Sequence, residues 1–365
     1  MHKIDWWLNV LDESDVIAVS SAMRNKSISQ GKLTQQFEEE LAAFLGVPYV
    51  VCAASGSAAL AMAYYACGLR SGDEILTSNV TFVATANASL LFGGRARSVD
   101  VDARGVIDVA RIREAIDQKT KIIVPVHMNG IACAMEEILE IASEYGIDVV
   151  EDACQAFGSK DEKGRFLGTF GRFGCFSLGM AKILTTGGGG FIVAHNKEDC
   201  EILKKIRNQG VFDVRKTCSY AQFGFNFKFT DLQASIGLNQ LRNIDKKIHQ
   251  AKEIYLRYQS LLKDKIQFLY SHIEKGEIPM RVVALTPLNH QIQKYLSLKN
   301  IFCALESQPL NKCGFLSIKG AFPMSDYFER HKLILPSGPS QSLLDVELVG
   351  AKILEFLEEN EICDA

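Results

Sequence analysis

The sequence reads Val149-Val150-Glu151-Asp152-Ala153-Cys154-Gln155-Ala156 near the middle of the chain. The stretch begins with apolar, β-branched residues, which predicts a buried strand that ends at the carboxylate of Asp152. An Asp at the end of a strand is also a common N-cap of a following helix. The stretch therefore predicts a strand. It leaves open whether Asp152 caps a helix or serves as the carboxylate of a binding site.

A second informative stretch carries Lys182, thirty residues after Asp152. It reads Phe176-Ser177-Leu178-Gly179-Met180-Ala181-Lys182-Ile183-Leu184-Thr185-Thr186 and continues with four glycines, Gly187 to Gly190. A lysine in apolar surroundings is poorly hydrated, which favours the neutral amine that attacks carbonyl groups. The glycines allow a positive φ or a close approach of the backbone to another group. Alone, such a lysine is most often a solvated surface charge, and a glycine run is most often a loop.

Lys182 and Asp152 together are the two groups that pyridoxal 5'-phosphate (PLP) requires. An amine holds this cofactor covalently, and a carboxylate pairs with its pyridinium nitrogen. The small residues Ser55-Gly56-Ser57-Ala58-Ala59 precede a helical pattern, and N–H groups at a helix start bind phosphate. The alternative for this loop is an ordinary strand-to-helix turn with Ser55 as its N-cap.

Strand-like and helical segments alternate through the first two thirds of the chain. Strands are expected at 49–53, 74–78, 96–101, 121–127, 148–152, 174–177 and 190–194, with helices at 57–67, 82–92, 109–116 and 135–145. This alternation predicts an α/β fold with a mainly parallel sheet and helices on both faces. Ligands of such sheets bind at the carboxyl ends of the strands, where Ser55, His127 and Asp152 fall.

The pattern changes in the last third. Residues 229–262 are typical of one long helix or two joined helices, followed by strand candidates at 281–285 and 301–306 and a helix at 343–357. A chain of 365 residues exceeds the usual limit for a single core. We expect a large domain over residues 1–245, which includes the N-terminal segment, and a smaller α+β domain over residues 246–365.

Composition excludes several classes of partner. The net charge of −3 and the absence of a polybasic run argue against nucleic acid and membrane surfaces. No apolar run is long enough to span a membrane, and the N-terminus lacks the pattern of a signal peptide. Ten cysteines without a Cys-x-x-Cys pair indicate neither a disulfide framework nor a metal site. Cys52, Cys154 and Cys175 are expected to be buried thiols, and a cytoplasmic location fits best.

These motifs resemble those of the DegT/DnrJ/EryC1/StrS family of PLP-dependent sugar aminotransferases. The family's motifs F-S-x-x-x-x-K-x-L-T-T-G-E-G-G and E-D-x-x-Q-A-x-G are both present, except that Gly188 stands where the family usually has Glu. Further matches lie between residues 28 and 241 in the family's order. They are Ser55-Gly56-Ser57-Ala58-Ala59-Leu60, Thr81-Phe82-Val83-Ala84-Thr85-Ala86-Asn87, Asp100-Val101-Asp102, Pro125-Val126-His127-Met128-Asn129-Gly130, Arg207-Asn208-Gln209-Gly210 and Gly224-Phe225-Asn226-Phe227-Lys228.

The resemblance implies the type I aminotransferase fold and PLP as cofactor. It implies that Lys182 holds the cofactor and acts as the base, and that Asp152 pairs with the pyridinium nitrogen. The other cofactor-binding residues that it implies are Gly56, Ser57 and Ser177 at the phosphate, Phe82 on the ring face, Gln155 near the 3-hydroxyl and Asn226 from the neighbouring subunit. The alternatives are core packing for Phe82, a turn for Asn226 and a satisfied core histidine for His127.

The resemblance also implies a reaction. An amino group would pass from a donor, usually glutamate, to the keto group of a nucleotide-linked sugar, in a homodimer with shared active sites. A branch of the family that has His at the lysine position performs dehydration, and Lys182 argues against that branch. Lys228 stands where the family usually has Arg, and the C-terminal third matches only loosely, so the sugar itself is left open.

Three other functions are alternatives to the amination of a sugar. A PLP-binding regulatory protein without turnover could have lost Lys182, Asp152 or Phe82, and the sequence retains all three. A PLP enzyme for a non-nucleotide keto-sugar acid or an amino acid stays open, because arginines that could clamp a carboxylate are present. These candidates are Arg207, Arg215 and Arg281. A Rossmann dehydrogenase is excluded, because no Gly-x-Gly-x-x-Gly follows the first strand.

Overall fold

The computed structural model describes residues 3–216, 219–220, 222–305 and 308–361. Its main sheet has seven strands in the order β1-β7-β6-β5-β4-β2-β3. The strands are β1 (Tyr49–Ala53), β2 (Glu74–Ser78), β3 (Arg95–Val99), β4 (Thr120–Val124), β5 (Asp148–Asp152), β6 (Phe173–Ser177) and β7 (Gly190–Ala194). Strands β2 to β6 run parallel, whereas β7 is antiparallel to both of its neighbours. The predicted α/β fold with a mainly parallel sheet is confirmed.

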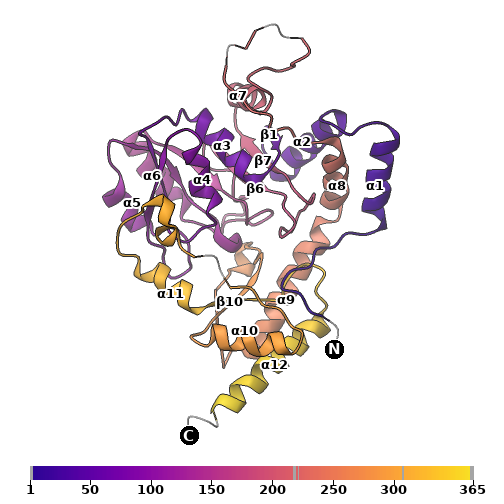
Figure 1. Ribbon diagram of the computed structural model, residues 1–365, viewed down its shortest axis with the longest axis vertical. Coiled ribbons are helices and arrows are strands. Elements are labelled where there is room, and N and C mark those ends of the chain that lie inside the picture. The colour runs from indigo at the N-terminus through magenta and orange to yellow at the C-terminus, as the bar shows by residue number, and fades with distance from the viewer. Residues whose placement is uncertain (1–2, 217–218, 221, 306–307, 362–365) are drawn as a thin grey trace.

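Helices cover both faces of this sheet (Figure 1). They include α2 (Lys32–Leu45), α3 (Gly56–Ala66), α4 (Ala84–Leu90), α5 (Val109–Ala115), α6 (Met135–Tyr145) and α7 (Lys197–Arg207). Successive side chains of a strand point to opposite faces. Accordingly, Val51 packs in the cluster that contains α3 and α7, whereas Val50 and Cys52 pack in the cluster that contains α2. Burial on both faces explains why strands such as β1 and β7 are apolar almost throughout.

The stretch predicted as one or two helices over residues 229–262 forms two. Helix α8 (Asp231–Arg242) begins with a capping box between Thr230 and Gln233, and α9 (Ile244–Leu262) follows after Asn243. Helix α8 packs against α2 and against α1 (Glu13–Arg24), a helix that the sequence analysis did not predict. Figure 1 shows α9 running from the main sheet toward the C-terminal elements.

The C-terminal elements surround a second, three-stranded antiparallel sheet in the order β10-β9-β8. Its strands are β8 (Gln267–Phe268), β9 (Val282–Leu285) and β10 (Lys332–Leu335), and its helices are α10 (Asn289–Leu298), α11 (Pro323–His331) and α12 (Leu343–Glu361). Short 3-10 helices lie at Met128–Gly130, Ile273–Lys275, Leu310–Lys312 and Gly314–Leu316. The domain boundary at residue 245 stays a prediction.

One predicted strand is wrong. Within 301–305 the structure has only two isolated bridges, Ile301 with Ile4 and Ala304 with Ile334, and Glu306 lies outside the described residues. Ile301 is buried against the N-terminal segment, so its apolar character reflects packing without a continuous strand partner. Among the described residues, no helix combines the length and apolarity needed to cross a membrane, and no cluster of His, Cys, Asp and Glu could hold a metal ion.

Candidate active site

A cavity of about 460 Å³ opens at the carboxyl ends of the parallel strands. This volume lies within the range of small-molecule and cofactor sites. Seven of the eight predicted cofactor-binding residues line it, namely Gly56, Ser57, Phe82, Asp152, Gln155, Ser177 and Lys182. A larger cleft of about 590 Å³ lies beside Arg104 and Glu277, and none of the predicted site residues lines it. The chemistry is therefore expected in the smaller cavity.

One end of the cavity is formed by the N-terminus of α3. Ser55 caps this helix, because its hydroxyl accepts the N–H of Ala58 at 3.0 Å. A Cβ on Gly56 would lie only 2.9 Å from the Cβ of Ser177, so glycine lets the helix start press against the end of β6. The N–H groups at the helix start and the Ser177 hydroxyl thus border one space, which the helix dipole makes favourable for an anion.

The glycine run after Lys182 serves both purposes expected of it. Gly187 and Gly189 have φ values of +77° and +121°, which favour glycine over residues with a Cβ. Gly190 approaches the start of α3 so closely that a Cβ would lie 2.6 Å from the Ser55 carbonyl carbon and 2.7 Å from the Gly56 nitrogen. The run therefore places the start of α3, the end of the cavity that suits an anion, beside the lysine loop.

Asp152 lies in the cavity wall with 5% of its surface exposed. Its Oδ2 accepts the hydroxyl of Thr85 at 2.7 Å, and its Oδ1 accepts the N–H of Cys154 at 3.1 Å. The Thr85 hydroxyl also lies 2.8 Å from that of Thr81. Thr85 belongs to the motif around Phe82, and the motif alone does not indicate its role. The structure shows that this threonine orients the carboxylate.

The broad faces of the cavity suit a flat ring. Phe82 leaves 59% of its surface exposed although it is large and apolar, and it lines the cavity. An exposed aromatic face can stack on a planar ligand, which the core-packing alternative does not explain. Gln155 is buried, and its Oε1 accepts the N–H of Asn129 at 3.1 Å. The Nε2 end of that amide is then left to donate to a ligand.

Lys182 lies on the loop between β6 and β7, and the N-terminal segment holds this loop. Trp7 donates its indole N–H to the Met180 carbonyl at 3.1 Å, and Asn9 donates to the Lys182 carbonyl at 2.7 Å. The buried Lys247 of α9 donates to the Asn9 side chain at 3.1 Å. Burial lowers the pKa of Lys247 to about 8, against the opposing effect of Asp15 and Asp12. This support could not be predicted from the sequence, because the partners of each hydrogen bond lie more than 170 residues apart and match no local motif.

His127 lies outside the cavity lining and is fully buried. Its Nε2 lies 2.8 Å from Glu151 Oε2, and its Nδ1 accepts the N–H of Cys133. Glu151 also accepts three backbone N–H groups, from Gly168, Phe170 and Gly171. Because neighbouring residues of β5 point to opposite faces, Asp152 faces the cavity while Glu151 holds a loop behind the sheet. The satisfied-core alternative for His127 fits this arrangement.

The three candidate arginines lie in different surroundings. Arg207 is buried, where it pairs with Glu38 and donates to the Cys52 carbonyl, so it supports the fold. Arg215 is exposed and pairs with Asp213. Arg281 alone of the three lines the cavity.

Two further predictions have a mixed outcome. Asn226 is exposed and lies outside the lining of the cavity of its own chain, so its role stays a prediction. Cys52 and Cys175 are buried as expected, but Cys154 is only half-buried, because it follows the end of β5 and lies in the cavity wall. Burial nevertheless raises the pKa of the Cys154 thiol well above its ordinary value, so the thiol stays protonated.

The residues of the cavity fit PLP on geometric grounds. Glycine at position 56 keeps open a space between the start of α3 and Ser177 that suits a phosphate. An aromatic face at Phe82, an oriented carboxylate at Asp152 and an amine at Lys182 line the same cavity. These are the contacts that the phosphate, the ring, the ring nitrogen and the carbonyl carbon of the cofactor require.

The chain is similar in sequence to known aminotransferases. Residues 9–354 match the model of the DegT/DnrJ/EryC1/StrS aminotransferase family. The chain is 30% identical to the GDP-perosamine synthase of Escherichia coli O157:H7, over 91% of this chain and 92% of that one. It is 32% identical to the UDP-4-amino-4,6-dideoxy-N-acetyl-beta-L-altrosamine transaminase of Campylobacter jejuni subsp. jejuni serotype O:23/36, over 67% and 65% of the two chains.

Solved structures share the fold. The aminotransferase TlmJ of Streptoalloteichus hindustanus superposes with a TM-score of 0.93 at 26% identity, covering 98% of this chain and 100% of that one. Because the match covers nearly the whole chain, the two proteins share one architecture. The chain belongs to the DegT/DnrJ/EryC1/StrS aminotransferase family and is a PLP-dependent aminotransferase.

Proposed function

We propose that this enzyme transfers an amino group to the keto group of a nucleotide-linked sugar, in the biosynthesis of amino sugars or surface polysaccharides. The observation that carries the proposal is one cavity that combines Lys182, Asp152, Phe82 and the start of α3. The substrate class is supported by the relatives, since the printed names of both curated relatives contain a nucleotide-linked amino sugar.

Each residue of the cavity would have a separate task. The N–H groups of Gly56 and Ser57 and the hydroxyl of Ser177 would bind the phosphate, and Phe82 would stack on the ring. Asp152 would hold a proton on the ring nitrogen, in an orientation fixed by Thr85. Gln155 would donate to the 3-hydroxyl. When bound, PLP supplies an electron sink for the carbon that gains or loses the amine.

Lys182 would serve both as the covalent holder of the cofactor and as the base. Once the substrate amine takes its place, its Nζ would remove a proton from the carbon next to the donor nitrogen and return one to the opposite side of the C–N system. A base needs a defined position relative to that carbon. The hydrogen bonds from Trp7 to the Met180 carbonyl and from Asn9 to the Lys182 carbonyl support such positioning.

Three further features belong to the proposal. The amino donor would be glutamate. The enzyme would be a homodimer in which Asn226 completes the site of its partner, in agreement with its exposure and its place outside the cavity of its own chain. The location would be cytoplasmic, in agreement with free thiols at all eight cysteines that the structure describes.

The test is a product analysis by mass spectrometry. Purified enzyme is incubated with PLP, glutamate and a panel of GDP-, UDP- and dTDP-linked 4-keto-6-deoxy and 3-keto sugars. We expect one panel member to gain an amine while glutamate becomes 2-oxoglutarate. Lys182→Ala is the control and should form no product, because it lacks both the covalent holder and the base.

Two outcomes would contradict the proposal. Amination of a free keto-sugar acid in place of every nucleotide-linked sugar would move the enzyme to another substrate class. A protein that binds PLP and turns over nothing would be a regulatory protein.

A further inference from the structure

Part of the cavity lining has no task in the proposed function. Every residue that the proposal assigns within the cavity of its own chain lies between residues 55 and 182. The remaining lining residues come from the N-terminal segment and from the C-terminal part of the chain, and they are Trp6, Arg281, Ala304, Leu305 and Ile334. Most of them are apolar or aromatic, so this part of the lining offers mainly apolar contacts to a ligand.

Backbone hydrogen bonds hold the segments of this part together. The N–H of Phe302 donates to the carbonyl of Ile4, two residues before Trp6, at 2.8 Å. Ala304 and Ile334 exchange two backbone hydrogen bonds, at 2.8 and 3.1 Å. The Trp6 carbonyl accepts an N–H from the chain just after β10 at 3.2 Å. The backbone of Trp6 is therefore fixed relative to its neighbours in the cavity wall.

The two adjacent tryptophans differ in what their indole N–H groups contact. Trp7 is buried, and its N–H donates to the Met180 carbonyl at 3.1 Å. Trp6 is half-buried and lines the cavity, and its indole N–H makes no hydrogen bond to any residue that the structure describes. A tryptophan N–H that is shielded from water usually has an acceptor, and the indole is a donor only. Trp6 therefore offers a hydrogen-bond donor to a ligand of the cavity.

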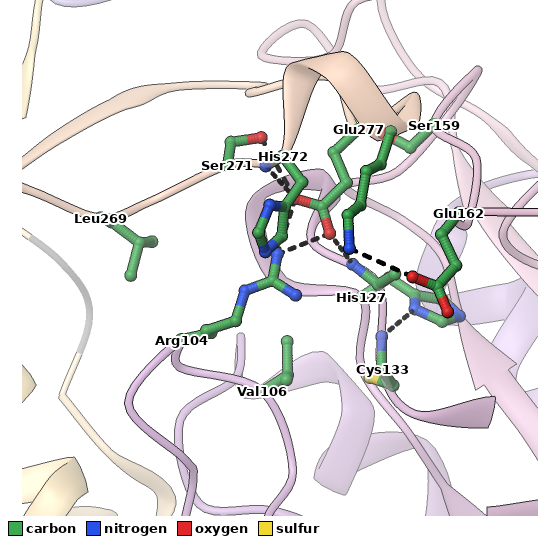
Figure 2. A network of polar contacts seen from close by, with 12 residues as sticks. Arg104, Val106, His127, Cys133, Ser159, Glu162, Leu269, Ser271, His272 and Glu277 are labelled. Atoms are coloured by element: carbon green, nitrogen blue, oxygen red, sulfur yellow. Dashed lines mark hydrogen bonds and ion pairs between the residues drawn. The ribbon is translucent and has the colours of Figure 1, made fainter. Parts of the chain in front are cut away.

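The ring of Trp6 is oriented by a charged neighbour. The Arg281 guanidinium lies 5.6 Å from the centre of this ring, and a cation over an aromatic face is attracted to it. Glu277, four residues before Arg281, is buried and anchors that chain. Its carboxylate accepts Arg104 Nη2 at 2.6 and 2.7 Å and the N–H of His272 at 2.6 Å, and Figure 2 shows Glu277 between these groups. The indole N–H of Trp6 thus has a limited range of directions.

We propose that Trp6 is a specificity-determining residue for the acceptor and donates its indole N–H to a hydroxyl of the sugar. The inference rests on the proposed function in requiring a sugar as acceptor. A hexose combines apolar C–H faces with hydroxyl groups, and the lining around Trp6 combines apolar side chains with one neutral donor. The carboxylates of an amino-acid donor bind charged groups more strongly. A donor at this place favours a sugar that has the matching hydroxyl over one that lacks it.

The two half-reactions are measured separately, by the loss of the visible cofactor band with glutamate and its return with the keto sugar. Trp6→Phe keeps an aromatic ring and removes the N–H. It should weaken the apparent affinity for the sugar by about 5- to 10-fold, as the loss of one hydrogen bond predicts, and leave the donor half-reaction unchanged. Trp7→Phe is the matched control, because it removes the same group from a residue that supports the Lys182 loop. It should slow both half-reactions.

Sugar analogues test whether the effect belongs to one hydroxyl. Each analogue lacks one hydroxyl of the sugar that the wild type aminates. For the analogue without the hydroxyl that Trp6 binds, wild type and Trp6→Phe should have the same affinity, whereas for the others the difference should persist. A difference that persists for every analogue would mean that Trp6 only supports the fold. If Trp6→Phe does not fold, Trp6→Leu replaces it, since it also lacks the N–H.

Other outcomes would also overturn the proposal. Equal losses in both half-reactions would make Trp6 a structural residue, and an unchanged affinity for the sugar would leave it without a role. Weaker inhibition of Trp6→Phe by the nucleoside diphosphate alone would assign Trp6 to the nucleotide. If the wild type aminates only a free keto-sugar acid, the proposed function fails while the same comparison with that acceptor still decides the role of Trp6. A wild type that aminates no sugar would overturn both proposals.

Discussion

At the scale of single residues, Thr85 contributes to the cavity by orienting another side chain, that of Asp152. Its hydroxyl donates to Asp152 at 2.7 Å, and its backbone carbonyl accepts the hydroxyl of the buried Tyr64 at 3.0 Å. Burial raises the pKa of Tyr64 well above its ordinary value, so the tyrosine stays a donor. The carboxylate of Asp152 is therefore oriented from behind by Thr85, which Tyr64 holds in turn.

We predict that Thr85→Val lowers kcat. The substitution keeps the shape but removes a hydrogen bond to a charged group, which corresponds to about a 10- to 100-fold loss. The matched control is Thr77→Val, since Thr77 is equally buried but donates to the Val124 carbonyl away from the cavity. Steady-state kinetics compare the two variants. Equal effects on kcat would mean that Thr85 only stabilises the fold.

Residue types and spacing sufficed to predict seven residues that the fold gathers around one cavity. They did not reveal the residues that hold these in place, such as Thr85, Asn9 and Lys247. The physical reason is that a group that binds a cofactor must have one particular chemistry, whereas a support can be any donor that the fold brings near. Asn9 and Lys247, for example, meet only because α9 packs beside the N-terminal segment.

Glycine decides how two elements meet at the end of the cavity where we expect the phosphate. Strand β7 begins at Gly190, and α3 begins at Gly56, with the Gly56 nitrogen 2.7 Å from where a Cβ on Gly190 would lie. We predict that Gly190→Ala separates the two elements and weakens the affinity for PLP. Gly188→Ala is the control from the same run, because its Cβ would meet nothing closer than 3.8 Å. Fluorescence titration of both apoproteins with PLP makes the comparison, and matching affinities would refute the prediction.

Lys247 gives α9 a pH-dependent contribution to stability. Burial lowers its pKa to about 8 from an ordinary value of 10.5, so between these values the folded state binds fewer protons than the unfolded state. The free energy of unfolding of the wild type should therefore rise, relative to Lys247→Met, as the pH increases through 8. Urea denaturation at pH 7 and pH 9 should show this difference growing by about 1 kcal/mol. A constant difference would mean that Lys247 does not titrate in this range.

The alternation of segments predicted the elements of the main sheet well, because most of its strands carry an apolar run that is buried on both faces. The C-terminal part was harder to predict. Residues 301–305 are apolar in part yet form no strand, since Ile301 and Ala304 each contact a different segment through a single bridge. Hydrophobicity reports burial, and only the pairing partner distinguishes a strand from a buried loop.

At the scale of the whole molecule, Asn226 could serve either its own subunit or a partner subunit. It lies in the chain between α7 and α8, part of which projects from the body of the molecule in Figure 1. Its backbone is fixed by a bridge to Asn208, and its side chain lies outside the cavity of its own chain. A residue that points to solvent from a fixed backbone can serve a partner subunit, or it can be a turn residue without a role in the site.

We predict that each active site is shared between two subunits about a two-fold axis. Lys182→Ala and Asn226→Ala should each be inactive alone, and mixing them under conditions of subunit exchange should restore activity. In a mixed dimer, one pocket unites the intact Lys182 of one chain with the intact Asn226 of its partner. Random exchange makes about half of all dimers mixed, so roughly a quarter of the pockets should work. The control mixture is Lys182→Ala with Asp152→Asn, which leaves no intact pocket in either arrangement. An active Asn226→Ala, or no recovery despite proven exchange, would leave Asn226 as a residue of its own subunit alone.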